Sequence, residues 1–188
     1  MRKKRESWAG SKFPEPRKLS QLLLGFSPRE QVILVSSFLD SLLGDLIAKR
    51  LRQNKKEISD FLGFDGDGRA PAASFGSRIQ LAYLLSLIDD NELKVLRAVK
   101  KVRNAFAHRV VCSFADEDVV EATKTMIDAL ERSGDKYVQS DKVRLSDAEW
   151  QDSKTKHLGL EEGRIGFFTG ATIVLIVQMK KMLEPNTT

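Results

Sequence analysis

The sequence predicts an all-α protein, folded as a single compact helical bundle of about six or seven helices and preceded by a mobile basic N-terminal arm. Apolar residues recur at three- and four-residue spacing over several stretches, which is typical of amphipathic helices. Proline and glycine are sparse, and β-branched residues do not alternate with polar ones as they do in strands. At 188 residues with 41% hydrophobic content, the chain has the size of one domain.

The predicted arm spans residues 1–26 and combines two prolines with little apolar periodicity. Its first 18 residues contain seven basic and two acidic side chains, whereas the rest of the chain contains 24 of each sign. The net charge of +5 therefore belongs to the arm, and bulk charge gives the remainder no affinity for a phosphate backbone. The arm is either a segment that binds nucleic acid or simply a solvated leader. In the rest of the chain, only a local basic patch could bind nucleic acid. The arm residues are Arg2, Lys3, Lys4 and Arg5, and the patch is Lys94, Arg97, Lys100, Lys101 and Arg103.

A helical domain is expected over residues 27–184, and its first helix begins at a capping box. Residues 27–30 read Ser-Pro-Arg-Glu, in which serine caps the third amide, glutamate reaches back, and proline occupies the first helical position. Asp40 lies beside the apolar stripe of this helix, so we expect it to have a basic partner, either Arg78 or Arg103. The stripe consists of Val32, Val35, Leu39, Leu42, Leu43 and Leu46, with Phe38 beside it.

Residues 55–64 are predicted to form a short second helix, followed by a loop over residues 65–71. The loop begins Asp-Gly-Asp-Gly, which resembles the start of a calcium-binding loop. The third acidic ligand and the terminal glutamate of such a loop are missing. We therefore expect a plain turn and no metal site.

Residues 74–108 are predicted to form two helices packed as an antiparallel hairpin. Ser74 is a suitable N-cap for the first helix, and Asp89-Asp90-Asn91 interrupts the apolar pattern and caps the second. The connection is expected to have at most three residues. The first apolar stripe is Ile79, Ala82, Leu85 and Ile88, flanked by Leu81 and Leu84, and the second is Leu93, Leu96, Val99, Val102 and Phe106.

Polar side chains lie inside this otherwise apolar hairpin, and we expect them to form an internal network with Asp40 that fixes the hairpin. They are Arg78, Tyr83, Asn104 and His108. Arg103 and His108 are five residues apart, about 140° around a helix axis, so they cannot both point at one small ligand from a straight helix. Either the helix ends near His108, or the two side chains meet partners on different surfaces, including those of a second subunit.

The remaining sequence predicts one further amphipathic helix and a final apolar one. Residues 116–118, Asp-Glu-Asp, open the first of these because acidic side chains complement the helix dipole. Residues 135–162 form a long polar connection, and residues 163–183 are apolar nearly all round, as in a central helix or one that meets a partner chain. The run 165–179 is too short to cross a bilayer. A single cysteine and the lack of a signal peptide predict a cytoplasmic protein without a membrane contact.

No Gly-rich phosphate loop, paired CxxC motif or HExxH sequence is present, so we expect neither a metal nor a cofactor. Arg103, Asn104 and His108 instead form an R-x4-H pattern that resembles the motif of HEPN-type nucleases. That resemblance implies metal-independent RNA cleavage by a dimer, in which histidine is the general acid/base and arginine stabilises the transition state. The structural alternative is a histidine that caps the last carbonyls of a helix while arginine pairs with an acid.

A broader resemblance covers about residues 27–130, with a weaker match in the final helix. It is carried by Phe38-Leu39-Asp40-x-x-Leu43, by Ser74-Phe75-Gly76-Ser77-Arg78-Ile79, by Val102-Arg103-Asn104-x-Phe106-Ala107-His108 and by Ser113-Phe114. These stretches are similar to the mannitol operon repressor family of bacterial regulators. The resemblance implies an all-helical fold without a helix-turn-helix, and a transcriptional repressor that acts through a regulatory protein partner. We also expect a homodimer. The basic arm and the 135–162 connection depart from the family's pattern.

Overall fold

The protein is represented by a computed structural model that describes residues 26–51, 54–66 and 68–132, together with Arg164, Phe167 and Ala171. This part of the chain is all-α, as predicted, and contains five helices. They are α2 (Pro28–Arg50), α3 (Lys55–Leu62), α4 (Phe75–Leu84), α5 (Asp90–His108) and α6 (Glu117–Arg132). Residues 1–25 of the predicted arm, including Arg2, Lys3, Lys4 and Arg5, and the predicted 135–162 connection lie outside the described residues.

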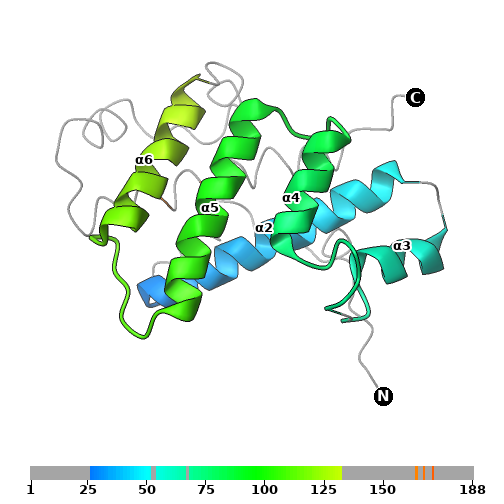
Figure 1. Ribbon diagram of the computed structural model, residues 1–188, viewed down its shortest axis with the longest axis horizontal. Coiled ribbons are helices and arrows are strands. Elements are labelled where there is room, and N and C mark those ends of the chain that lie inside the picture. Colours follow the sequence, from blue (N-terminus) through cyan, green and yellow to red (C-terminus); the bar gives the residue numbers. More distant parts are fainter. Residues whose placement is uncertain are drawn as a thin grey trace.

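The described helices form two layers (Figure 1). In the front layer α4, α5 and α6 lie side by side, and successive helices run in opposite directions. Helix α2 crosses behind α5 and α4 and contacts both, while the short α3 packs against α2. Helix α5 is therefore central, because it has α4 on one side, α6 on the other and α2 beneath it.

Helix α2 begins at the predicted capping box. The Glu30 amide hydrogen-bonds to the Ser27 side chain, and the Ser27 amide donates back to Glu30 Oε2 at 2.8 Å. The hydrogen bonds from Ser27 lower the pKa of Glu30. Every member of the predicted stripe is buried, and Leu39 and Leu43 are completely inaccessible. Full burial of one leucine side chain contributes about 1.5–3 kcal/mol, so this stripe is a main source of the stability of the fold.

Helix α2 is also long and apolar enough to cross a membrane by length and composition alone, with a mean hydropathy of 1.5 over its most apolar window. Of that window, 61% is buried inside the protein, against α4 and α5. Core helices of soluble proteins have the same properties.

The α4–α5 hairpin forms as predicted, but its connection is longer than three residues. Helix α4 ends at Leu84 and α5 starts at Asp90, so residues 85–89 connect them. The Ser86 amide donates to the Tyr83 carbonyl and the Leu87 amide to the Ala82 carbonyl, with Ser86 in the left-handed region at φ 55°. This is a Schellman motif, which ends a helix and usually has glycine at the left-handed position. Ile88 is still buried, although it lies in the connection and not in the helix.

Arg78 lies at the centre of the core, with only 1% of its surface exposed. Its guanidinium donates to Asp40 Oδ1 at 2.8 Å and to the Asp40 carbonyl at 3.2 Å. It also donates to the carbonyls of Ala72 at 3.0 Å and Leu62 at 2.7 Å, and it lies over the ring of Phe64. The predicted partnership of Asp40 with Arg78 is therefore confirmed. One side chain of α4 joins α2, the end of α3 and the loop before α4.

The core is closed next to α5 by aromatic rings. The Phe106 and Phe114 centroids are 4.9 Å apart, and Phe114 in turn lies 5.7 Å from Phe167, which is completely buried. Arg164 Nε donates to Gln31 Oε1 of α2 at 2.9 Å. The described residues of the last predicted helix thus contact both α2 and the segment that follows α5.

Candidate functional site

The R-x4-H pattern occupies the last two turns of α5. Arg103 and Asn104 are half-buried, and Arg103 Nη1 donates to Asn104 Oδ1 across 3.3 Å. His108 is the final helical residue and is exposed. The expectation that His108 joins an internal network is wrong, because Phe106 occupies the buried face of this turn and a residue two positions later points about 200° away.

Arg103 and His108 do not converge within one chain. Helix α5 is continuous from Asp90 to His108, so the two residues keep regular helical spacing. They are about 140° apart around the axis and about 7.5 Å apart along it. A single phosphate could contact both side chain types only if a second chain supplied one of them.

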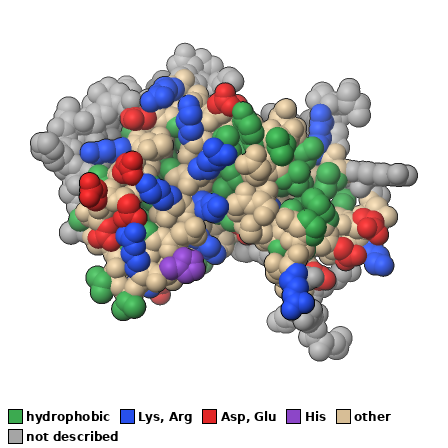
Figure 2. Space-filling model, viewed as in Figure 1, with side chains coloured by type: hydrophobic (Ala, Val, Ile, Leu, Met, Phe, Trp, Pro, Cys, Tyr) green, Lys and Arg blue, Asp and Glu red, His purple; other side chains and the backbone are tan. Residues whose placement is uncertain are grey.

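The exposed face of α5 carries a row of basic side chains that leads to His108. Lys94, Arg97 and Lys101 are exposed, and Asn104 and His108 continue the same row. The spacings of three and four residues place all five on one side of the helix, over about 21 Å of its length. Figure 2 shows Lys and Arg side chains gathered over α5, with a histidine at the lower end and hydrophobic side chains on the α4 side. The basic patch was predicted from the sequence. Its continuation to His108 was not predicted, although the three- and four-residue spacing indicates it.

The row is bordered differently on its two sides. Towards α6, Lys101 Nζ donates to Glu121 Oε2 at 2.7 Å. Towards α4, Arg97 Nη2 donates to Gln80 Oε1 at 3.3 Å, and Lys100 lies against Gly76. The side chains of Lys101 and Glu121 are 48% and 71% exposed, so their pair contributes less than about 1 kcal/mol and leaves Lys101 accessible to a ligand.

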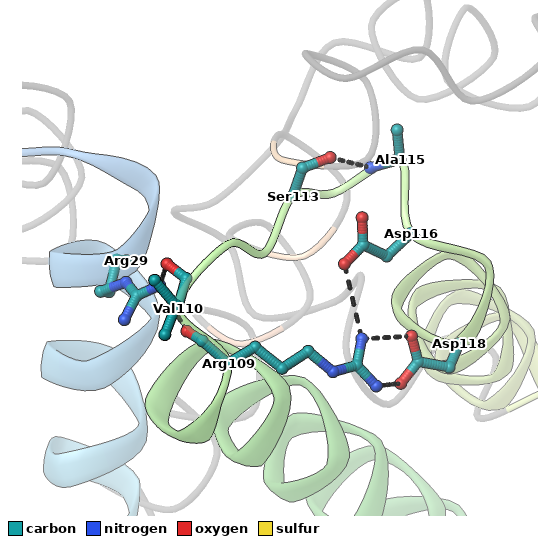
Figure 3. Close-up of polar contacts among 7 residues, drawn as sticks. All are labelled: Arg29, Arg109, Val110, Ser113, Ala115, Asp116 and Asp118. Atoms are coloured by element: carbon teal, nitrogen blue, oxygen red, sulfur yellow. Dashed lines mark hydrogen bonds and ion pairs between the residues drawn. The ribbon is translucent and has the colours of Figure 1, made fainter.

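The loop after α5 is held by arginines on two sides (Figure 3). Arg29 of α2 donates through Nη2 to the carbonyls of Arg109 and Val110, at 2.7 and 2.8 Å. The Arg109 guanidinium forms a two-pronged bond with the Asp118 carboxylate, at 2.8 and 2.6 Å, and lies 3.4 Å from Asp116. The hydrogen bond with Asp118 is the main cause that raises the pKa of Arg109, and it lowers the pKa of Asp118.

This arrangement holds two apolar side chains in solvent. Val110 and Val111 are 93% and 85% exposed, at the tip of the loop whose backbone Arg29 binds. The next residue, Cys112, is half-buried, and burial is the main cause that raises the pKa of its thiol, followed by the negative charge of Asp116. At neutral pH the thiol therefore stays protonated, which is the unreactive form.

The predicted five-residue network does not form as one unit. Only Asp40 and Arg78 are bonded to each other. Tyr83 donates its hydroxyl to Asp90 Oδ1 at 2.7 Å, which raises the pKa of Tyr83, and Asn104 accepts from Arg103. The sequence could not separate these groups, because polar residues in apolar stretches look alike until the helix faces are fixed.

An open cavity of about 610 Å³ lies at the opposite end of α5 from His108. It is lined by the α4–α5 connection and the adjoining helix ends: Tyr83, Leu84, Ser86, Leu87, Ile88, Asp89, Asp90 and Glu92. Asp89 and Glu92 are engaged in the capping box of α5, where each bonds the other's backbone amide. Their carboxylates therefore already have partners in the fold.

Within the described ranges, no cluster of three His, Cys, Asp or Glu side chains could hold a metal ion. The structure offers two candidate surfaces, the basic row of α5 and the exposed Val110 and Val111 beside His108.

A scan against protein-family models and searches of curated proteins and of solved structures returned no match to this chain.

Proposed function

We propose that this protein is a repressor-type transcriptional regulator that acts through contacts with another protein and not by catalysis. The proposal combines the resemblance to the mannitol operon repressor family with the arrangement of α5. It takes the protein to be cytoplasmic and homodimeric, and it assigns no cofactor.

The observation that supports it most is the divergence of Arg103 and His108 on one continuous helix. General acid/base chemistry needs the proton-transfer group and the charge-stabilising group at the same reacting atoms, within hydrogen-bond reach. One chain does not supply that geometry here. The buried polar groups, in contrast, are used by the scaffold, since Arg78 binds a carboxylate and the carbonyls of three residues.

A second candidate is a metal-independent endoribonuclease that uses Arg103, Asn104 and His108. It is favoured by one specific observation: His108 is exposed and ends a row of basic side chains. In a homodimer, the arginine of one protomer and the histidine of its partner would be free to meet at one phosphate. An imidazole is the side chain that most often transfers protons in general acid/base catalysis.

The two functions separate in a cleavage assay with His108→Ala and Arg103→Ala. Labelled single-stranded and duplex RNA is incubated with the wild type and each variant in the presence of EDTA. The regulator proposal expects equal and negligible cleavage by all three proteins. Cleavage by the wild type that falls 100-fold or more in both variants, about the loss expected when a general acid/base is removed, would establish the nuclease instead.

The regulatory role itself is tested by transcript profiling in the native host. Deletion of the gene is expected to raise a defined set of transcripts, and complementation with wild type or His108→Ala is expected to restore repression equally. An unchanged transcript profile after deletion would refute the proposal. Light scattering of the purified protein checks the proposed homodimer.

A further inference from the structure

The exposed sides of α4 and α5 form one continuous surface, called here the α4–α5 face. On α5 it consists of the row Lys94, Arg97 and Lys101, with exposed Lys100 beside it against Gly76. On α4 it consists of exposed Gln80 and Leu84 and half-buried Ser77, which also follow three- and four-residue spacing. The Arg97–Gln80 hydrogen bond connects the two rows. In Figure 2 basic side chains cover α5 on this side of the molecule, and hydrophobic ones lie next to them towards α4.

The positive charge of this face is confined to α5, because the α4 side chains of the face are uncharged. Helix α4 contains no acidic residue, whereas the exposed side of α6 that borders α5 carries Glu117, Glu121 and Asp128 with a single basic residue, Lys124, among them. A polyanion with charge on all sides, such as a nucleic acid duplex, would meet those carboxylates as soon as it extended beyond α5. A partner with one acidic row and neutral flanks avoids this repulsion.

The face also provides an apolar contact. Leu84 is 68% exposed, and the antiparallel register of Gln80 with Arg97 places it opposite the first turns of α5. Leu84 borders the open cavity, together with Leu87 and Ile88. An apolar side chain of a partner would be accepted there, next to the end of the basic row.

Aromatic rings, on which unpaired bases stack, are not available on this face. The exposed aromatic side chains among the described residues are Phe26, which precedes α2, and Phe61 in α3. Tyr83 is half-buried and its hydroxyl is bonded to Asp90. A single-stranded nucleic acid would therefore gain only backbone contacts.

We infer that the α4–α5 face binds an acidic amphipathic helix of a partner protein. Side chains on such a helix at three- and four-residue spacing repeat every 5 Å or so, which is the spacing of Lys94, Arg97 and Lys101. Its glutamates would bind the basic row, and an adjoining leucine would contact Leu84 and the cavity, a recognition mode known from helix-in-groove complexes. Because Asp89 and Asp90 line that cavity, the acidic row must end before the leucine.

This inference rests on the proposed function, since it supplies the chemistry of the protein that the regulator contacts. The two can nevertheless fail separately. RNA cleavage that depends on His108 refutes the regulator without affecting peptide binding, and a lack of peptide binding refutes the docking face without affecting the cleavage assay.

The test is fluorescence anisotropy with a labelled helical peptide that has four glutamates in one row followed by a leucine on the same side. A scrambled peptide of equal composition, a short RNA duplex and a single-stranded RNA are the competing probes. The full-length protein is compared with K94E/R97E and with K55E/K56E, an equal charge reversal at exposed positions of α3. Leu84→Ser is compared with Val110→Ser, an exposed apolar side chain outside the face.

The expected result is that the patterned peptide binds at least tenfold more tightly than the scrambled one. Its affinity should fall on the order of tenfold or more in K94E/R97E and severalfold in Leu84→Ser, and remain unchanged in both control variants. Equal binding of the two peptides, or an equal loss in K55E/K56E, would overturn the inference in favour of bulk electrostatics. Tighter binding of either RNA than of the patterned peptide, abolished by K94E/R97E, would overturn it in favour of nucleic acid.

Discussion

Replacement of Arg78 by methionine tests whether this side chain organises the fold. Methionine keeps an unbranched apolar stem but removes four hydrogen bonds: two to Asp40, one to the Ala72 carbonyl and one to the Leu62 carbonyl. Breaking a buried ion pair by removing one partner costs about 3–5 kcal/mol, because the groups left behind lose their compensation. Asp40 remains 23% exposed, so water recovers part of that cost at the carboxylate. The two carbonyls bonded inside the core account for the rest, and we expect a loss of about 3–4 kcal/mol.

Urea denaturation followed by circular dichroism measures this change as a shift of the midpoint at constant slope. Asp40→Asn is the companion variant: the amide oxygen still accepts a hydrogen bond from Arg78, but the buried guanidinium loses its counter-charge, so the expected loss is also about 3 kcal/mol. The free energy of unfolding of a domain is only about 5–15 kcal/mol, so the Arg78 effect is readily resolved. A loss below about 1 kcal/mol for Arg78→Met would show that the guanidinium is not an organising contact and would refute the reasoning.

Three further predictions concern the termini and loops of helices. Ser86→Gly relieves a left-handed residue in the Schellman motif and should raise the free energy of unfolding by about 0.5–1 kcal/mol in thermal or urea unfolding; a decrease would contradict the assigned backbone strain. The depressed pKa of Asp118 contributes stability that is fully present above its ordinary value of 3.8 and is lost as the pH falls through the lowered value. Asp118→Asn should therefore flatten the acid limb of the stability–pH curve, and an unaltered limb would exclude a contribution from its bond with Arg109. Arg29→Ala removes two bonds to loop carbonyls and should speed amide hydrogen exchange over residues 109–112 with little effect on global stability, whereas unchanged exchange would show that Arg29 does not hold the loop.

Local sequence signals predicted the helix starts because a cap and its helix are close in the chain. Ser27, Ser74 and Asp89 are all N-caps in the structure, and each accepts from an amide within three residues. The partnership of Asp40 with Arg78 joins residues 38 positions apart, and it was predictable from the cost of an unpaired charge near a core. The end of α4 was missed because its left-handed position holds serine where glycine is the usual signal.

The candidate site was harder to predict because it depends on which helix face is left uncovered. The residues just before His108 in the sequence are apolar, and for this reason its side chain was expected to be buried. It lies, however, on a different face of the helix from the buried residues. Phe106 is buried while His108 is exposed, and only the packing of α2, α4 and α6 around α5 decides this. The bonds of Arg29 and Arg109 likewise depend on where three separate segments meet, so no local pattern indicates them.

Arg109 takes part in two different contacts through different atoms. Its carbonyl accepts from Arg29 at the start of α2, while its guanidinium holds Asp118 at the start of α6. The Val110–Val111 peptide bond, although open to solvent, is therefore supported from two directions and should resist a protease until one of these attachments releases. The rate of limited digestion of the native protein would then measure how often the contacts that join α2, the end of α5 and the start of α6 open, and not the flexibility of the loop alone.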